Sequence, residues 1–110
     1  MKLSDYVIDF MARQGVRHVF LISGGAVIHL VDSASRHPKF QYICTQHEQG
    51  AGAAADAYSR ITENLGFVLV TSGPGATNLT TSMSNAYFDS IPAVFISGQV
   101  ATFRLRPSEK

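Results

Sequence analysis

Two groups of residues in this sequence could bind or act on a ligand. Residues 71–78 read Thr-Ser-Gly-Pro-Gly-Ala-Thr-Asn and follow the apolar run 67–70. This pattern predicts a short buried strand, a glycine turn and a helix that begins at Pro74. In α/β proteins such a turn brings the backbone close to a ligand. The second group is His47-Glu48-Gln49-Gly50, in which Glu48 begins an alanine-rich segment.

Glu48 has two interpretations. A carboxylate at the start of a helix is favoured by the helix dipole, by about 0.3–1 kcal/mol, and needs no further role. Alternatively, a partly buried carboxylate among alanines would have a raised pKa, which suits proton transfer.

The glycine turn does not identify its own ligand. The sequence contains neither Gly-x-Gly-x-x-Gly nor the phosphate loop Gly-x-x-x-x-Gly-Lys-Ser/Thr, so a plain tight turn stays an open alternative. A second turn, Ser23-Gly24-Gly25, follows an earlier apolar run. We expect both turns at one edge of a sheet, because the carboxyl ends of parallel strands meet there.

Metal and nucleophile chemistry are not indicated. Ala51 stands where the zinc motif His-Glu-x-x-His needs its second histidine, and His18, His29 and His37 lack metal-like spacing, so no metal ligand is expected. The single cysteine, Cys44, excludes an internal disulfide. Because it lies in an apolar run, we expect it to be a buried core thiol.

Composition limits the class of protein. The chain has 110 residues, a size that supports one domain. Only 15% of the residues are charged, which suggests that a partner covers part of the surface. A net charge of +1 without a basic block argues against nucleic acid, and Arg104 and Arg106 are expected to be a solvated end. No signal peptide or membrane span is indicated, and a reducing, cytoplasmic location is expected.

The periodicity predicts alternating helices and strands. Each predicted strand is a continuous apolar run, so we expect helices on both faces of an open, doubly wound parallel sheet. This is a three-layer α/β/α fold with four strands in the order 2-1-3-4. Residues 101–110 have no partner element, and the chain is expected to stop before the domain is finished. The predicted helices are 4–14, 26–35, 48–62 and 74–88, and the predicted strands are 19–22, 40–44, 67–70 and 93–96.

The motifs at this spacing resemble the N-terminal pyrimidine-binding (PYR) domain of thiamine diphosphate enzymes. The most similar branch is that of acetolactate synthase, pyruvate oxidase and benzoylformate decarboxylase. The resemblance covers nearly all of residues 1–110, which implies a single domain that is the N-terminal part of a PYR domain. It runs through Ser23-Gly24-Gly25-Ala26, His47-Glu48-Gln49-Gly50, the segment 54–60, the segment 70–78, Asp89-Ser90-Ile91-Pro92 and Ser97-Gly98-Gln99-Val100.

The resemblance implies a role for Glu48 as the catalytic residue. In the family this carboxylate hydrogen-bonds a ring nitrogen of the cofactor's aminopyrimidine and so helps to remove the proton from C2 of the thiazolium. The cofactor then attacks the carbonyl group of a small 2-oxo acid. Proton transfer of this kind requires a well-placed carboxylate, as the bottom-up interpretation also predicts.

Further cofactor-binding residues follow from the same resemblance. Pro74 and Asn78 match the turn that borders the pyrimidine ring. Gly25 and Ala26 match a loop near the thiazolium and the substrate, and Gln99 matches a residue near the reacting centre. The helix of residues 50–60 matches a dimer-contact helix, which implies a homodimer or tetramer.

The departures from the family pattern are as informative. The family binds the diphosphate through Mg²⁺ held by a separate domain with a Gly-Asp-Gly motif, which is absent here. The family's PYR domain has six strands, and Ala101 follows Gln99-Val100 where the synthases commonly have proline. The resemblance thus implies an enzyme part that is inactive without a diphosphate-binding domain or subunit. FAD is possible in this family but not indicated.

Several alternatives stay open. The domain could be a non-catalytic assembly or interaction module with the thiamine diphosphate fold, using the small residues of its helix 50–60 as a contact surface. A generic nucleotide-binding α/β domain is a further alternative. Synthase-like motifs favour carboligation over decarboxylation, but they do not name the substrate.

Overall fold

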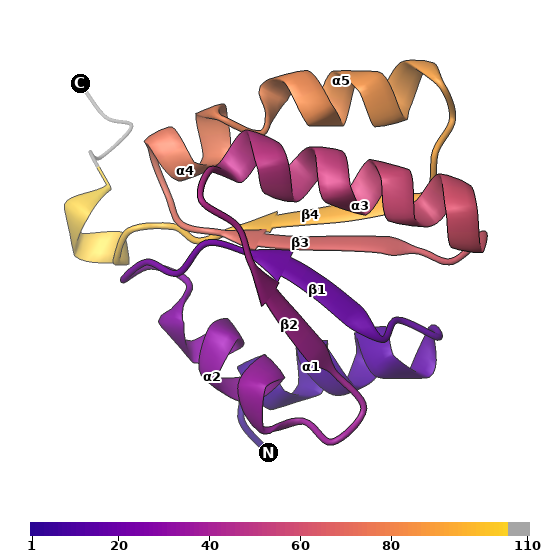
Figure 1. Cartoon of the computed structure of the whole chain (residues 1–110). Coiled ribbons are helices and arrows are strands. Elements are labelled where there is room, and N and C mark those ends of the chain that lie inside the picture. Colours follow the sequence, from indigo (N-terminus) through magenta and orange to yellow (C-terminus); the bar gives the residue numbers. More distant parts are fainter. Residues whose placement is uncertain (106–110) are drawn as a thin grey trace.

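The centre of the structure is a parallel sheet of four strands with helices on both faces (Figure 1). The computed structural model describes residues 1–105, so Arg106 lies outside the described residues. The strand order is β2-β1-β3-β4, which confirms the predicted fold class and order. The strands are β1 (His18–Leu21), β2 (Gln41–Cys44), β3 (Gly66–Val70) and β4 (Ala93–Ser97); the helices are α1 (Leu3–Arg13), α2 (Ile28–Arg36), α3 (Glu48–Thr62), α4 (Pro74–Thr77), α5 (Thr80–Phe88) and the 3₁₀ helix η1 (Thr102–Arg104).

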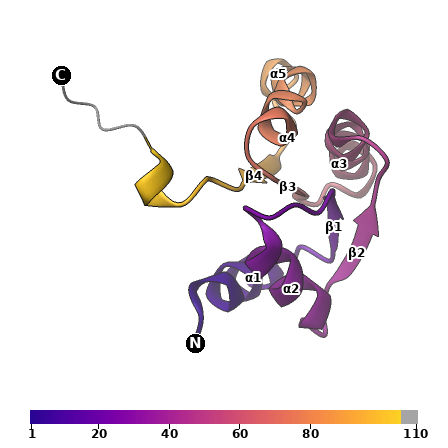
Figure 2. The same ribbon diagram turned by 90° about the vertical axis from the view of Figure 1, so that its left-hand side faces the viewer.

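The helices form two layers. In the perpendicular view, α3, α4 and α5 lie on one side of the sheet, and α1 and α2 lie on the other (Figure 2). The two inner strands are buried on both faces because their side chains alternate. Val19, Leu21, Phe67 and Leu69 belong to the cluster beneath α1 and α2, whereas Phe20, Val68 and Val70 belong to the cluster beneath α3. Among residues 1–105, no helix has both the length and the apolar character needed to cross a bilayer.

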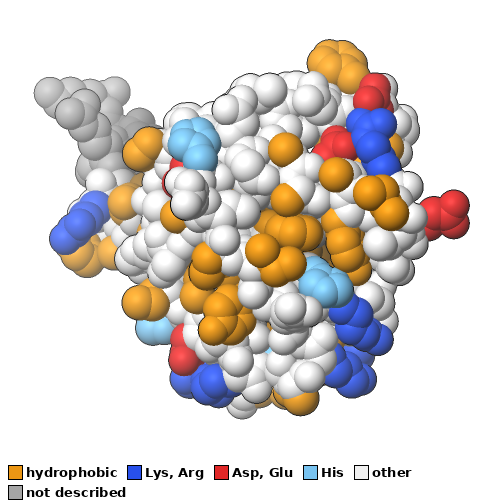
Figure 3. All heavy atoms as spheres, in the orientation of Figure 1, with side chains coloured by type: hydrophobic (Ala, Val, Ile, Leu, Met, Phe, Trp, Pro, Cys, Tyr) orange, Lys and Arg blue, Asp and Glu red, His pale blue; other side chains and the backbone are white. Residues whose placement is uncertain are grey.

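The two edge strands are less covered than expected. The sequence predicted that every strand would be buried on both faces, but most of β2 is exposed and β4 is only partly buried. Cys44 is exposed, so the prediction of a buried core thiol was wrong. Figure 3 shows apolar side chains gathered over the middle of the face that β2 presents. Within residues 1–105 the apolar run on this edge strand is therefore largely exposed.

The predicted helix 74–88 is divided into α4 and α5. The chain turns at Asn78 and Leu79, where the amide of Leu79 donates to the carbonyl of Ala76 at 3.1 Å, three residues back. The Thr80 hydroxyl donates to the carbonyl of Thr77 at 2.7 Å, and so takes a carbonyl near the break. Competition of threonine hydroxyls for backbone groups is a known cause of helix distortion. The break places Asn78 at the end of α4 rather than in the middle of a helix.

Small residues on α3 serve close packing within this chain. A Cβ on Gly52 would approach Ser82 Oγ on α5 at 2.5 Å, and a Cβ on Gly66 of β3 would approach the Ala55 carbonyl oxygen at 2.6 Å. Ala51 and Ala55 are fully buried in the same layer. The small residues therefore let the side chain of Ser82 on α5 pack against α3, and let β3 at Gly66 approach the backbone of α3 at Ala55.

Candidate functional site

The turns that follow β1 and β3 lie at the same edge of the sheet. Phe20 pairs with Val68 and Leu21 with Leu69, so the two strands end side by side. A Cβ on Gly24 would approach Thr71 Oγ1 at 2.7 Å, which shows that the two turns are in direct contact. The expectation that both turns share one edge is thus confirmed. Gly98, which follows β4, packs closely against the turn after β1. A Cβ on Gly98 would approach the Ala26 carbonyl carbon at 2.5 Å.

Glu48 is brought to this edge by the start of α3. The helix begins after His47, whose ring Nδ1 accepts a hydrogen bond of 3.1 Å from the amide of Gln49 and so caps the helix. Glu48 is half-buried, and its Oε2 accepts a hydrogen bond of 3.0 Å from the side-chain amide of Asn78. The other oxygen, Oε1, lies 3.7 Å from the position that a Cβ on Gly75 would occupy. Glu48, Asn78 and the glycine turn therefore form one group.

The pKa of Glu48 is lowered, not raised. Its main cause is the hydrogen bond from Asn78, followed by a backbone hydrogen bond at the start of the helix, and His47 lowers the pKa further. Each of these groups favours the charged carboxylate, and together they outweigh the smaller effect of burial. The predicted raised pKa was therefore wrong for this chain. At neutral pH Glu48 is a carboxylate that accepts hydrogen bonds.

Pro74 is the first residue of α4, as the sequence predicted. The preceding Gly73 has a φ of 64°, a conformation that favours glycine, and a Cβ there would meet nothing within 4 Å. Pro74 is exposed, and its carbonyl accepts a hydrogen bond of 3.0 Å from the amide of Asn78. This short helix thus links the open turn to the residue that orients Glu48.

Gly25, Ala26 and Gln99 lie together, apart from the Glu48 group. They line a cleft of about 590 Å³ at the same edge of the sheet. A volume of this size is typical of small-molecule sites. Gly25 is exposed and a Cβ on it would meet nothing within 4 Å, so the cleft is open on that side. The other residues that line the cleft are His29, Thr71, Ser72, Val100, Ala101, Phe103 and Arg104.

Sequence reasoning did not assign a site role to several of these residues. Thr71 is the first residue of the motif 71–78, but the pattern predicts a role only for residues that follow it. His29 is expected only to be a structural or surface residue, and it lines the cleft from the first turn of α2. Arg104 was expected to be a solvated end, and it borders the cleft from η1, an element that the pattern did not predict.

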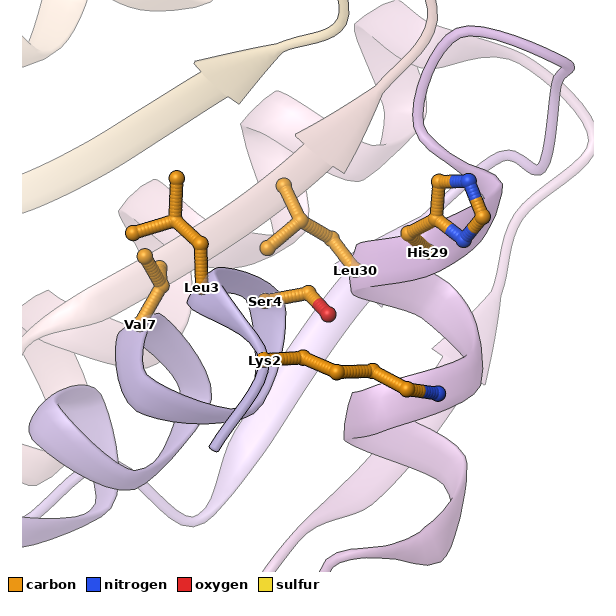
Figure 4. Close-up of a pocket in the computed structure, with 6 residues that line it drawn as sticks. All are labelled: Lys2, Leu3, Ser4, Val7, His29 and Leu30. Carbon is orange, nitrogen blue, oxygen red and sulfur yellow. The ribbon is translucent and has the colours of Figure 1, made fainter.

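A second hollow lies between α1 and α2 and contains none of the predicted site residues. Its volume is about 400 Å³, and it is lined by Lys2, Leu3, Ser4, Val7, His29 and Leu30. Figure 4 shows the apolar side chains of Leu3, Val7 and Leu30 pointing into the space between the two helices. His29 borders both this hollow and the cleft. Within residues 1–105 no group of three His, Cys, Asp or Glu side chains could hold a metal ion.

Comparison with known proteins gives a consistent result. Residues 1–107 match the sequence model of the family described as "Thiamine pyrophosphate enzyme, N-terminal TPP binding domain". The chain is 52% identical over 94 residues to "Acetolactate synthase, mitochondrial" of Schizosaccharomyces pombe, an alignment that covers 86% of the chain and 14% of that protein. It is 48% identical over 99 residues to "Acetolactate synthase large subunit" of Buchnera aphidicola subsp. Schizaphis graminum, covering 90% of the chain and 17% of the relative.

A third relative is "Acetolactate synthase isozyme 3 large subunit" of Escherichia coli, which is 46% identical over 99 residues. That alignment also covers 90% of the chain and 17% of the relative. The chain therefore spans about one sixth of the length of the curated relatives that it matches.

Proposed function

Because the chain belongs to the thiamine pyrophosphate enzyme family, as its N-terminal TPP-binding domain, we propose that it forms the pyrimidine-binding half of an active site that acts on 2-oxo acids. Thiamine pyrophosphate is the same compound as thiamine diphosphate. Carboligation of the acetolactate synthase type is favoured over decarboxylation, since the relatives above are named acetolactate synthases. The chain alone is inactive in this proposal, because it supplies only one wall of the site.

The observation that supports this most directly is the hydrogen bond from Asn78 to Glu48. It occupies Oε2 and leaves Oε1 without a side-chain partner within residues 1–105, beside the glycine turn that contains the buried Gly75 and the open Gly73. A ligand with a protonated ring nitrogen or an amino group would find an ionised acceptor there, at the start of a helix and next to the exposed Gly73 and Pro74. The residues present therefore fit an aminopyrimidine.

Each residue has a defined part in this arrangement. Glu48 accepts a proton or a hydrogen bond at Oε1, and Asn78 fixes the orientation of the carboxylate through Oε2. Pro74 and the open glycine turn border the ring, while Gly25, Ala26 and Gln99 border the cleft in which the 2-oxo acid is processed. When bound, thiamine diphosphate supplies the carbanion chemistry. The diphosphate and Mg²⁺ are held by a diphosphate-binding domain or subunit outside this chain.

A second copy of the chain is the proposed partner for the outer sides of α3 and α5. The buried side of α3 already packs against α5, so the contact uses exposed residues such as Ile61, Tyr87 and Phe88, which are 82%, 80% and 81% exposed. The hollow on α5 is lined by Thr80, Met83, Ser84, Tyr87 and Phe88, none of which is charged. The hollow itself therefore carries no charge that would repel a second copy. In sedimentation experiments, Tyr87→Lys should lower the association of the chain and Tyr6→Lys on α1 should not; a wild-type chain that is monomeric at every concentration would contradict this partner.

A hybrid enzyme tests the proposed function. The chain replaces the corresponding 99 residues of the E. coli isozyme 3 large subunit, and turnover of pyruvate, a small 2-oxo acid, is measured together with binding of thiamine diphosphate. Glu48→Gln should abolish turnover while the hybrid stays folded. Glu63→Gln is the matched control, because Glu63 is an exposed glutamate at the end of the same helix. Wild-type turnover and C2 proton exchange in Glu48→Gln would overturn the assignment.

The second candidate is a non-catalytic assembly module with the same fold. The exposed apolar surfaces of β2 and α5 favour it, because an interaction module requires such surfaces and no catalytic carboxylate. It predicts a hybrid that assembles but never binds thiamine diphosphate. The cytoplasmic location stays a prediction, since the S. pombe relative is named as mitochondrial.

A further inference from the structure

Thr71 lies between the two parts of the candidate site. It follows β3 directly and lines the cleft that Gly25, Ala26 and Gln99 border. Its side chain occupies the space next to Gly24, where a Cβ would approach Oγ1 at 2.7 Å and Cγ2 at 2.8 Å. On its other side, a Cβ on Gly75 would approach Cγ2 at 2.9 Å. One side chain therefore touches both βα turns.

Thr71 contacts its neighbours in the described part of the chain by packing and not by hydrogen bonds of its side chain. No side-chain hydrogen bond of Thr71 is formed within residues 1–105, whereas its Cγ2 methyl group contacts the backbone of both turns. Gly75 in turn lies next to Glu48 Oε1, at 3.7 Å from the Cβ position. Thr71 and Glu48 therefore lie on either side of the place that a Gly75 side chain would fill, so that Gly75 is the neighbour of both.

We propose that Thr71 is a positioning residue, whose Cγ2 methyl group sets the distance between the Glu48 carboxylate and the cleft. This inference rests on the proposed function and adds to it a residue that acts through the position of Glu48. Packed interiors transmit small changes of volume, so removing one methyl group lets the Gly75 turn move toward Gly24. A displacement of about 1 Å in a catalytic group can cost about 100-fold in rate.

The first test uses the isolated chain without any cofactor. In Thr71→Ser the Cγ2 methyl group is absent, and we expect the NMR signals of the Asn78 side-chain amide and the Glu48 titration to shift. Thr71→Val keeps a methyl group at that place and should restore both signals, which a role for the hydroxyl would not allow. Thr62→Ser is the matched control, because Thr62 is exposed and lies at the opposite end of α3 from Glu48.

A rescue experiment separates the two contacts of Thr71. Gly75→Ala places a methyl group against Cγ2, so its loss of stability should decrease in the Thr71→Ser background. The methyl group of Gly24→Ala also meets Cβ and Oγ1 of Thr71, and both atoms remain in serine. Thr71→Ser should therefore not restore the stability that Gly24→Ala loses. Equal rescue of both variants, or of neither, would overturn the proposed role of Cγ2.

The hybrid enzyme supplies the functional measurement. Thr71→Ser should lower kcat by about 10- to 100-fold with little change in KM, because substrate binding is kept while the carboxylate is displaced. Thr71→Val should recover most of the loss. An unchanged kcat in Thr71→Ser would overturn the inference but leave the proposed function intact. If Glu48→Gln is fully active, the proposed function fails, whereas the NMR test of Thr71 still stands.

Discussion

The side-chain amide of Asn78 donates a hydrogen bond of 3.0 Å to Glu48, thirty residues earlier in the chain. This bond joins the end of α4 to the start of α3 and fixes one oxygen of the carboxylate. It is also the largest cause of the lowered pKa of Glu48. The orientation of the candidate catalytic group and the largest part of the lowering of its pKa therefore depend on one amide.

The first prediction concerns this bond. Asn78→Ala should raise the pKa of Glu48 toward its ordinary value of 4.5, since the main donor to the charged form is lost. NMR titration of the Glu48 carboxyl carbon measures the change. Asn85→Ala, at an exposed position on α5, is the control and should leave this pKa where it is. A pKa of Glu48 that does not rise in Asn78→Ala would show that the backbone and His47 are sufficient.

The same bond gives a pH dependence of stability. Because the folded-state pKa of Glu48 is lowered, its interaction stabilises the fold above the unfolded pKa and is lost as the pH falls through the folded value. The difference in unfolding free energy between wild type and Asn78→Ala should therefore be constant near neutral pH and shrink in acid. Urea unfolding at a series of pH values measures it, and a difference that grows in acid would contradict the sign.

Two glycines of α3 should respond in opposite directions to alanine. Gly52→Ala forces a Cβ against Ser82 and should destabilise the chain by about 1–3 kcal/mol, the usual cost of overpacking. Gly50→Ala meets nothing within 4 Å and should stabilise it by about 0.5–1 kcal/mol through helix propensity. Chemical unfolding followed by circular dichroism compares them, and equal effects would contradict the contact between α3 and α5.

The ion pairs of Arg60 should contribute unequally. Arg60 bonds Asp56, which is 9% exposed, and also Asp89 at 2.6 Å, which is exposed. Arg60→Met leaves the Asp56 carboxylate buried without this partner and should lower the stability more than the loss of Asp89 does. Asp89→Asn breaks an exposed pair and should cost about 0–1 kcal/mol. Thermal unfolding ranks the two variants, and the reverse order would be inconsistent with the burial of Asp56.

Cys44 should react in the folded protein. The thiol is exposed on β2, so a thiol reagent such as DTNB should modify it without unfolding. The stoichiometry should approach one, because the sequence contains a single cysteine. Cys44→Ser should give no reaction. If wild-type Cys44 reacts no faster than the protein unfolds, β2 is covered in solution, as a second copy of the chain could do.

Local patterns in the sequence predicted most of the fold. The four continuous apolar runs became the four strands, and β1 and β3 are buried on both faces as such runs indicate. The edge strands differ because periodicity reports the apolar character of a residue, not whether another element lies above it. Cys44 has the same apolar neighbours as a core residue, and only the position of β2 at the edge of the sheet exposes it.

In the candidate site, too, some features follow from the local sequence and others only from tertiary contacts. The sequence by itself determined the two glycine turns, Pro74 at the start of a helix and Glu48 at the start of another, since each depends on neighbours a few residues away. Only the tertiary structure decided the direction in which the pKa of Glu48 is shifted and the two turns that Thr71 lies against. Their partners are Asn78, thirty residues from Glu48, and Gly24, on a different strand end. Parallel strands are joined by long crossovers, which bring such residues together. A local sequence pattern does not predict contacts between residues that are so far apart in the chain.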